Sequence, residues 1–170
     1  MIIVLNGPLG IGKSTLAEAL MESIEHCVML DGDQLAATNP PPADGLEHLH
    51  STLALLVAHH RRSGYRHFVI DHLWRSSAEI ADLRRRLLAI DANAEMRCFL
   101  LTLSEDEHLR RIERRQRARA IDEREFELRT VAEERAALAR HAGPDLGVPF
   151  DVSGPPSELV TTMLRHLALR

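Results

Sequence analysis

The sequence predicts an α/β fold with a five-stranded parallel sheet and helices on both of its faces. Short apolar runs alternate along the 170-residue chain with longer segments in which apolar residues recur at helical spacing. Short strands that alternate with amphipathic helices are typical of a parallel sheet between two layers of helices. We therefore expect one three-layer domain over residues 1–170.

Five apolar runs are the candidate strands. The first is rich in β-branched residues and ends at Asn6, and the second ends at the letters "DGD". The third ends at Asp71, and all five are short enough to be buried strands. The candidate strands cover residues 2–5, 27–30, 67–70, 96–103 and 148–152.

The segments between these runs carry the apolar stripes of amphipathic helices. Residues 38–45 include three consecutive prolines, so we expect a turn or loop there. Ser104, with Glu107 three residues later, has the spacing of a capping box and predicts a helix start. The expected helices cover 14–25, 46–62, 76–89, a segment that begins after Ser104, 122–141 and 158–169.

Parallel sheets of this kind bind ligands beyond the carboxyl ends of their strands. The residues that follow the candidate strands are therefore the first places to look for a site. These segments are 7–14, 31–33, 71–75, the stretch after Ser104, and 153–157.

The stretch "GPLGIGKST" follows the first candidate strand and opens the first candidate helix. It fits the Gly-x-x-x-x-Gly-Lys-Ser pattern of a phosphate-binding loop, in which glycines let successive backbone N–H groups face an anion. In this pattern Lys13 reaches the β- and γ-phosphates of a nucleotide, and the hydroxyl of Ser14 ligates Mg²⁺. The candidate nucleotide-binding residues here are Gly7, Leu9, Gly10, Ile11, Gly12, Lys13, Ser14 and Thr15.

Lys13 is the only lysine of the chain, and arginine supplies every other basic side chain apart from histidine. A planar guanidinium is a poor replacement for a compact ammonium inside a tight anion site. The single lysine therefore supports a phosphate cradle over the alternative of a glycine turn without a ligand.

Two acidic residues, Asp31 and Asp33, follow the second candidate strand. Alternate residues of an extended segment point the same way, so both carboxylates are expected to face the phosphate cradle. Phosphoryl transfer to an alcohol needs a group that orients the hydroxyl and accepts its proton. We assign Asp33 as this base and Asp31 as an outer-sphere magnesium ligand. The alternative is a polar turn in which Asp33 caps a helix.

The third candidate strand ends in "FVIDHLWR", where several apolar residues precede Asp71. This Walker-B-like pattern makes Asp71 a candidate contact to Mg²⁺ through water, or to the substrate. Trp74, the only tryptophan, is a candidate wall of an acceptor pocket, with ordinary packing as the alternative. Arg75 is either a partner for an anion on the substrate or a solvated surface residue.

Seven arginines are concentrated in "HLRRIERRQRARAIDER". Arg111 and Arg115 share a helix face, and Arg119 lies almost above them. We expect a lid over about residues 114–124, in which Arg115 and Arg119 stabilise the transferring phosphoryl group and closure expels water. The alternatives are a solvated helix whose arginines pair with glutamates, and a nucleic-acid stripe. The net charge of -4 and the few aromatic residues disfavour nucleic acid.

In the order of their elements and motifs, these features resemble the small P-loop kinases. That group includes the nucleoside monophosphate kinases, shikimate, gluconate and adenylylsulfate kinases, and chloramphenicol phosphotransferase. "LDGDQL" resembles gluconate and adenylylsulfate kinases, and "LNG" resembles chloramphenicol phosphotransferase. The resemblance implies a three-layer P-loop NTPase fold, ATP and Mg²⁺ as cofactors, and a small-molecule acceptor.

Two further motifs resemble adenylate kinases. "RIERR" is similar to their Arg-Ile-x-x-Arg, which implies that Arg111 lies against adenine and Arg115 meets the γ-phosphate. "DHLWR" resembles their Asp-Gly-Phe-Pro-Arg, which gives Arg75 the place of the arginine that holds the acceptor phosphate. The Gly-Phe-Pro is absent, and so is their arginine after the strand-two aspartate, which argues against a nucleotide acceptor.

The lysine and methionine expected downstream in gluconate kinase are absent as well. His48 and His50 lie in the acceptor region, where we expect them to be exposed helix residues.

The composition limits the other classes of function. Cys27 and Cys98 lie in apolar stretches and are expected to be buried, reduced thiols. No segment has 18 consecutive apolar residues, and the start of the chain does not resemble a signal peptide. We expect a cytoplasmic monomer or homodimer without a membrane or nucleic-acid partner.

The sequence thus predicts an ATP-dependent phosphotransferase that moves the γ-phosphate to a hydroxyl of a small polar metabolite or antibiotic. The acceptor-binding region is expected over about residues 34–64. One alternative is a nucleoside monophosphate kinase. The other is a non-catalytic ATP-sensing module, which the acid pair and the arginine-rich segment argue against.

Overall fold

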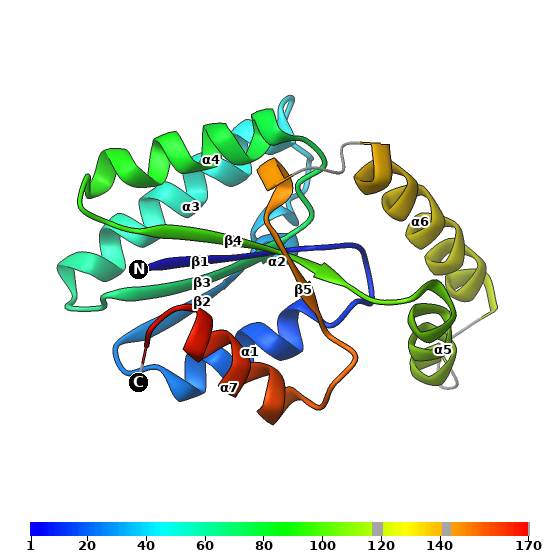
Figure 1. Ribbon diagram of the computed structural model, residues 1–170. Coiled ribbons are helices and arrows are strands. Elements are labelled where there is room, and N and C mark those ends of the chain that lie inside the picture. The colour runs from blue at the N-terminus through cyan, green and yellow to red at the C-terminus, as the bar shows by residue number, and fades with distance from the viewer. Residues whose placement is uncertain (117–120, 141–143, 170) are drawn as a thin grey trace.

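The computed structural model describes residues 1–116, 121–140 and 144–169 and confirms the predicted sheet (Figure 1). All five strands are parallel, in the order β2-β3-β1-β4-β5. Each strand begins at the predicted residue and ends within two residues of the predicted end. The strands are β1 (Ile2–Asn6), β2 (Cys27–Asp31), β3 (His67–His72), β4 (Met96–Thr102) and β5 (Val148–Asp151).

Helices cover both faces of the sheet, as predicted. On one face α1 (Lys13–Ser23) packs beside α7 (Pro156–His166), and on the other α3 (Gly45–Arg62) packs beside α4 (Ser77–Ile90) (Figure 1). Two helices, α5 (Glu105–Gln116) and α6 (Ile121–Arg140), lie beyond the carboxyl ends of the strands. A 3₁₀ turn, η1 (Pro144–Leu146), precedes β5. In the described part of the chain, no helix has both the length and the apolarity to span a bilayer.

The central strand β1 shows why the strands read as continuous apolar runs. Ile2 and Val4 belong to the apolar cluster shared with α3 and α4, whereas Ile3 and Leu5 belong to the cluster shared with α1 and α7. All four side chains are fully buried, because both faces of a parallel sheet are covered. The loop that follows β1 therefore starts from a rigid position.

Buried Asn6 at the end of β1 fastens two distant segments beside that loop. Its Nδ2 donates to the carbonyl oxygens of Trp74 at 3.0 Å and Leu146 at 3.2 Å. Its Oδ1 accepts from the N–H of Trp74 at 2.9 Å. One asparagine side chain thus holds the segment after β3 and the segment before β5 in place.

The chain after β2 differs from the prediction of an extended segment. A short helix, α2 (Gly32–Ala36), begins at once, and Asp31 is its N-cap rather than Asp33. The Oδ1 of Asp31 accepts from the N–H groups of Asp33 at 2.9 Å and Gln34 at 3.1 Å. A Cβ at Gly32 would lie only 2.7 Å from Cβ of His72, so glycine is required where β2 meets β3.

The two cysteines are buried and free, as predicted. Burial raises the pKa of Cys27 to about 11 and the pKa of Cys98 to about 12. Both thiols therefore stay protonated and unreactive at neutral pH.

Candidate nucleotide and acceptor site

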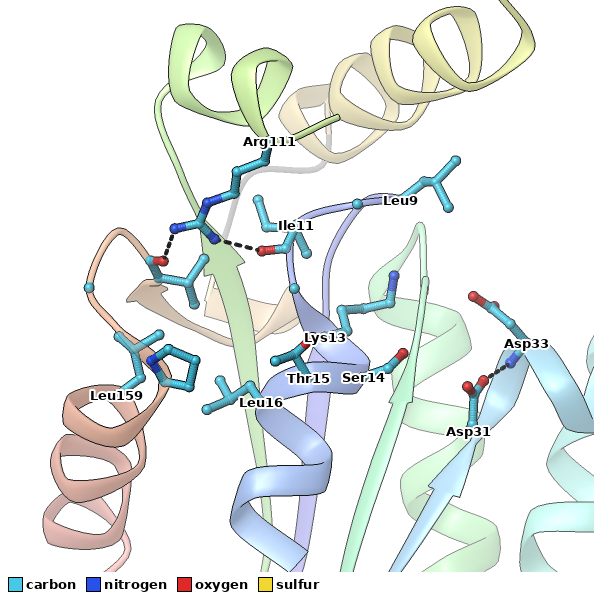
Figure 2. Close-up of a pocket in the computed structure, with 15 residues that line it drawn as sticks. Leu9, Ile11, Lys13, Ser14, Thr15, Leu16, Asp31, Asp33, Arg111 and Leu159 are labelled. Atoms are coloured by element: carbon cyan, nitrogen blue, oxygen red, sulfur yellow. Dashed lines mark hydrogen bonds between the residues drawn. The ribbon is translucent and has the colours of Figure 1, made fainter. Parts of the chain in front are cut away.

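A cavity of about 680 Å³ opens at the carboxyl ends of β1 and β2 (Figure 2). The phosphate loop and the first turn of α1, residues 9–16, form one wall. Asp31 and Asp33 lie at one end of the cavity, and Arg111 and Leu159 lie toward the other (Figure 2). All the predicted nucleotide-binding residues of the loop line this cavity except Gly7, which is buried.

Two glycines give the phosphate loop its shape. Gly10 has a φ angle of 75° and Gly12 has one of 110°, values that residues other than glycine rarely adopt. A Cβ at Gly10 would also lie 3.1 Å from Cγ1 of Ile112 in α5. Gly12 is the N-cap of α1 and offers no side chain to the free N–H groups of the first turn. Those groups, with the positive end of the helix, form an anion-binding site.

The stem of Lys13 is buried, with only 7% of the residue exposed, and its ammonium lies on the cavity wall. Its Nζ donates to the carbonyl oxygen of Pro8 at 3.3 Å. A carbonyl does not neutralise the charge, so the ammonium keeps a full positive charge for a phosphate. The compact head fits beneath the loop where a guanidinium would not.

The hydroxyl of exposed Ser14 donates to Oδ2 of Asp71 at 2.8 Å. Asp71 is 2% exposed, and burial raises its pKa to about 6. Its other oxygen, Oδ1, is buried and has no hydrogen-bond partner among the described residues. Asp71 therefore lies beneath Ser14, with one carboxylate oxygen bound to that hydroxyl and the other left without a partner among the described residues.

These oxygens fit Mg²⁺, which takes few protein ligands and keeps several waters when it binds nucleotide phosphates. Among the described residues, no group of three or more His, Cys, Asp or Glu side chains is arranged to hold a metal by itself. The Ser14 hydroxyl is the direct ligand that the loop offers. The unpaired Oδ1 of Asp71 and the carboxylate of Asp31 are suitable acceptors for the metal's waters.

Asp33 is held by a residue that sequence reasoning missed. Its Oδ1 lies 2.7 Å from Nδ1 of His72, at the end of β3. This hydrogen bond holds the pKa of Asp33 below its ordinary value, so the carboxyl is ionised at neutral pH. An ionised carboxylate only accepts, so Nδ1 of His72 carries the proton. The Asp33 side chain is 59% exposed and remains open to a ligand in the cavity.

The end of the cavity away from the acid pair has the features of a base-binding slot. Arg111 of α5 donates to the carbonyl oxygens of Ile11 at 3.3 Å and Val152 at 2.7 Å, which spreads its flat guanidinium between the loop and the residue that follows β5 (Figure 2). Pro156 and Leu159 provide apolar surface nearby. Arg111 was expected beside the adenine from the resemblance to adenylate kinases, and the segment 153–157 was expected from its place after the fifth strand. Leu159 was not expected here.

Two residues of the third-strand motif lie away from the cavity surface described above. Trp74 is fully buried in the cluster with α3 and α4, which corrects the expectation that it walls an acceptor pocket. Its Nε1 donates to Nε2 of His50 at 3.0 Å, and Nδ1 of His50 lies 2.8 Å from Oδ2 of Asp82. His50 is therefore a buried residue and not the exposed one predicted. Arg75 is exposed and is not among the described residues that line the cavity.

Residues 117–120 of the predicted lid lie outside the described residues. The helix start at Ser104 is confirmed, since its Oγ accepts from the N–H of Glu107 at 3.3 Å. Arg115 belongs to α5, and Arg119 lies outside the described residues. The roles of Arg115 and Arg119 therefore remain predictions.

The sequence profile of the AAA_33 family, described as an AAA domain, matches residues 2–141. The chain belongs to this family. No curated protein matches the chain.

Solved structures with the same fold include small-molecule kinases. The gluconokinase of Sinorhizobium meliloti 1021 is 20% identical, with a TM-score of 0.70 over 98% of this chain and 90% of that one. The tunicamycin resistance protein of Deinococcus radiodurans is 17% identical, with a TM-score of 0.71 over 99% and 96%. The shikimate kinase of Bacteroides thetaiotaomicron is 15% identical, with a TM-score of 0.61 over 99% of both chains. The fold is therefore that of the small P-loop kinases, as the resemblance implied.

Proposed function

We propose that the chain is an ATP- and Mg²⁺-dependent kinase that transfers the γ-phosphate to a hydroxyl of a small polar metabolite or antibiotic. One observation carries the proposal: Lys13 in its phosphate loop and the ionised carboxylate of Asp33 line the same cavity. A phosphate loop alone indicates only the phosphate donor. A carboxylate beside it supplies the group that an alcohol acceptor needs. The fold shared with a gluconokinase and a shikimate kinase supports this assignment.

The nucleotide lies along the cavity in this proposal, with its base near Arg111 and its phosphates at the loop. Lys13 and the N–H groups of the loop bind the phosphates, and the Ser14 hydroxyl ligates the magnesium. Bound magnesium neutralises charge on the phosphates. Because Asp71 accepts the Ser14 hydrogen, the lone pairs of that hydroxyl are free for the metal. Asp31 accepts hydrogen bonds from the waters of the metal.

Asp33 orients the acceptor hydroxyl and takes its proton. The acceptor oxygen forms a bond to the γ-phosphorus as the bond from that phosphorus to the β,γ-bridging oxygen breaks, and ADP leaves. Lys13 stabilises the charge on the moving group, and we assign the same task to Arg115 and Arg119. Arg75 is retained as a candidate contact for an anionic acceptor.

The acceptor class can be found by measuring ADP release from ATP and Mg²⁺ with a panel of acceptors. The panel contains nucleotides, sugars, sugar acids, amino-alcohols, and aminoglycoside and phenicol antibiotics, with Lys13→Ala as the inactive control. We expect one class of alcohol to gain a phosphate, detected by mass. A preference for nucleoside monophosphates would instead identify a nucleotide kinase. ATP binding without any phosphorylated product would favour the sensing module.

A further inference from the structure

One side chain of α6 contacts the phosphate loop directly, through a contact that the proposed reaction does not use. The N–H of Leu9 donates to Oε2 of Glu134 at 2.6 Å. Glu134 and Leu9 are separated by 125 positions, so this contact joins the helix after the arginine-rich segment to the loop. The N–H groups of a phosphate loop are expected to bind the phosphates of the ligand. A carboxylate of the protein itself on one of these groups is therefore unexpected.

The carbonyl group of the same residue is held from the other side. Nε2 of His108 lies 2.8 Å from the Leu9 oxygen, and His108 is fully buried. Nδ1 of His108 lies 3.3 Å from Nη1 of Arg135, which only donates, so Nε2 carries the ring proton. Arg135 also donates to the carbonyl oxygen of Leu103, so its guanidinium is directed at α5 and the end of the segment that leads into it. Glu134 of α6 and His108 of α5 therefore hold the two polar groups of Leu9, and Arg135 of α6 contacts the His108 ring.

Leu9 lies toward the end of the cavity that holds Asp31 and Asp33, which we call the acceptor end. Figure 2 shows it on the side of Asp33 and far from Leu159. The ammonium of Lys13 lies close to Leu9, since its Nζ donates to the carbonyl oxygen of Pro8, the residue before Leu9, at 3.3 Å. The lysine of a phosphate loop points to the β- and γ-phosphates. The Glu134 carboxylate is thus placed where the γ-phosphate of ATP would bring further negative charge.

We propose that Glu134 is a specificity-determining residue that weakens binding of the triphosphate relative to the diphosphate. The inference rests on the proposed function only in placing nucleotide phosphates along this loop. ADP leaves the Leu9 contact undisturbed, because it has no group at that end. ATP brings a like charge close to the carboxylate, so tight binding of ATP requires Glu134 to leave Leu9. Loading with the phosphate donor is thereby coupled to the position of α6.

The test compares the Kd values of ATP and ADP, each with Mg²⁺, by calorimetry on the full chain. Glu134→Gln keeps an oxygen that accepts from the Leu9 N–H but removes the charge. We expect the Kd of ATP to fall about fivefold or more and the Kd of ADP to change by less than about twofold. Glu133→Gln, an exposed neighbour on the same helix, is the matched control and should change neither.

Three results would overturn the inference. Unchanged Kd values of both nucleotides in Glu134→Gln would show that the carboxylate does not sense the γ-phosphate. Equal weakening of both nucleotides would make Glu134 a support of the loop only. If the unaltered chain binds neither nucleotide, the proposed function fails together with the inference, which separates that case from the first two.

Discussion

The two ends of the cavity are built in different ways. At the nucleotide end, the phosphates are expected on backbone groups of one continuous segment, shaped by Gly10 and Gly12. At the acceptor end, the groups come from side chains paired between elements, as in the contact of Asp33 in α2 with His72 in β3. The difference teaches that the phosphate cradle depends on local backbone shape. The carboxylate proposed as the base depends on contacts between distant elements.

The largest expected effect comes from the nucleotide end. Lys13→Ala should reduce turnover by about 10²- to 10³-fold and weaken ATP binding, because the charge beneath the loop is lost. Lys13→Arg keeps the charge but not the compact shape and should restore little of either. ADP release and calorimetry with ATP measure both effects. Full activity of Lys13→Arg would show that charge, rather than local shape, governs this end.

A smaller effect is expected from the pairing at the acceptor end. His72→Ala should lower kcat about tenfold and leave the Kd of ATP unchanged, because Asp33 loses the donor that orients it. His72→Asn places an Nδ2–H near the position of the ring donor and should recover most of the loss. Steady-state kinetics with the acceptor found in the panel, beside calorimetry with ATP, distinguish these cases. Equal loss in the alanine and asparagine variants would argue against a positioning role for His72.

The smallest effect on catalysis is expected behind the acceptor end. Trp74→Phe removes the N–H that satisfies Nε2 of buried His50 and should lower the free energy of unfolding by about 1–3 kcal/mol. Nucleotide affinity should stay unchanged, because the Trp74 side chain lies in the core. Thermal or urea unfolding measures the loss, with Tyr65→Phe, an exposed aromatic, as the control. A stable variant with altered turnover would instead place Trp74 in the site.

What the sequence predicted follows the same division. The strand starts and the glycine loop between β1 and α1 were predicted correctly, because consecutive residues specify a buried strand and a glycine loop. Asp33 and His72 are 39 positions apart in the sequence, and Trp74 and His50 are 24 apart. No local sequence pattern therefore predicts either pair. The helix α2 is only five residues long, too short to show a periodic stripe. His50 was wrongly predicted to be exposed, because its partners Trp74 and Asp82 are distant in the sequence.

The central claim is that the carboxylate of Asp33 accepts the proton of an acceptor alcohol beside an ATP-binding loop. Asp33→Asn tests it most directly, because the amide keeps the shape and an oxygen that accepts from His72 but is no longer a base. The Kd of ATP and the rate of phosphoryl transfer are measured on the same preparation, with Asp145→Asn, an exposed carboxylate of η1, as the control. The account predicts near-normal ATP binding and a transfer rate lower by about 10²-fold or more. Normal ATP binding with unchanged transfer would contradict it and remove Asp33 from the reaction.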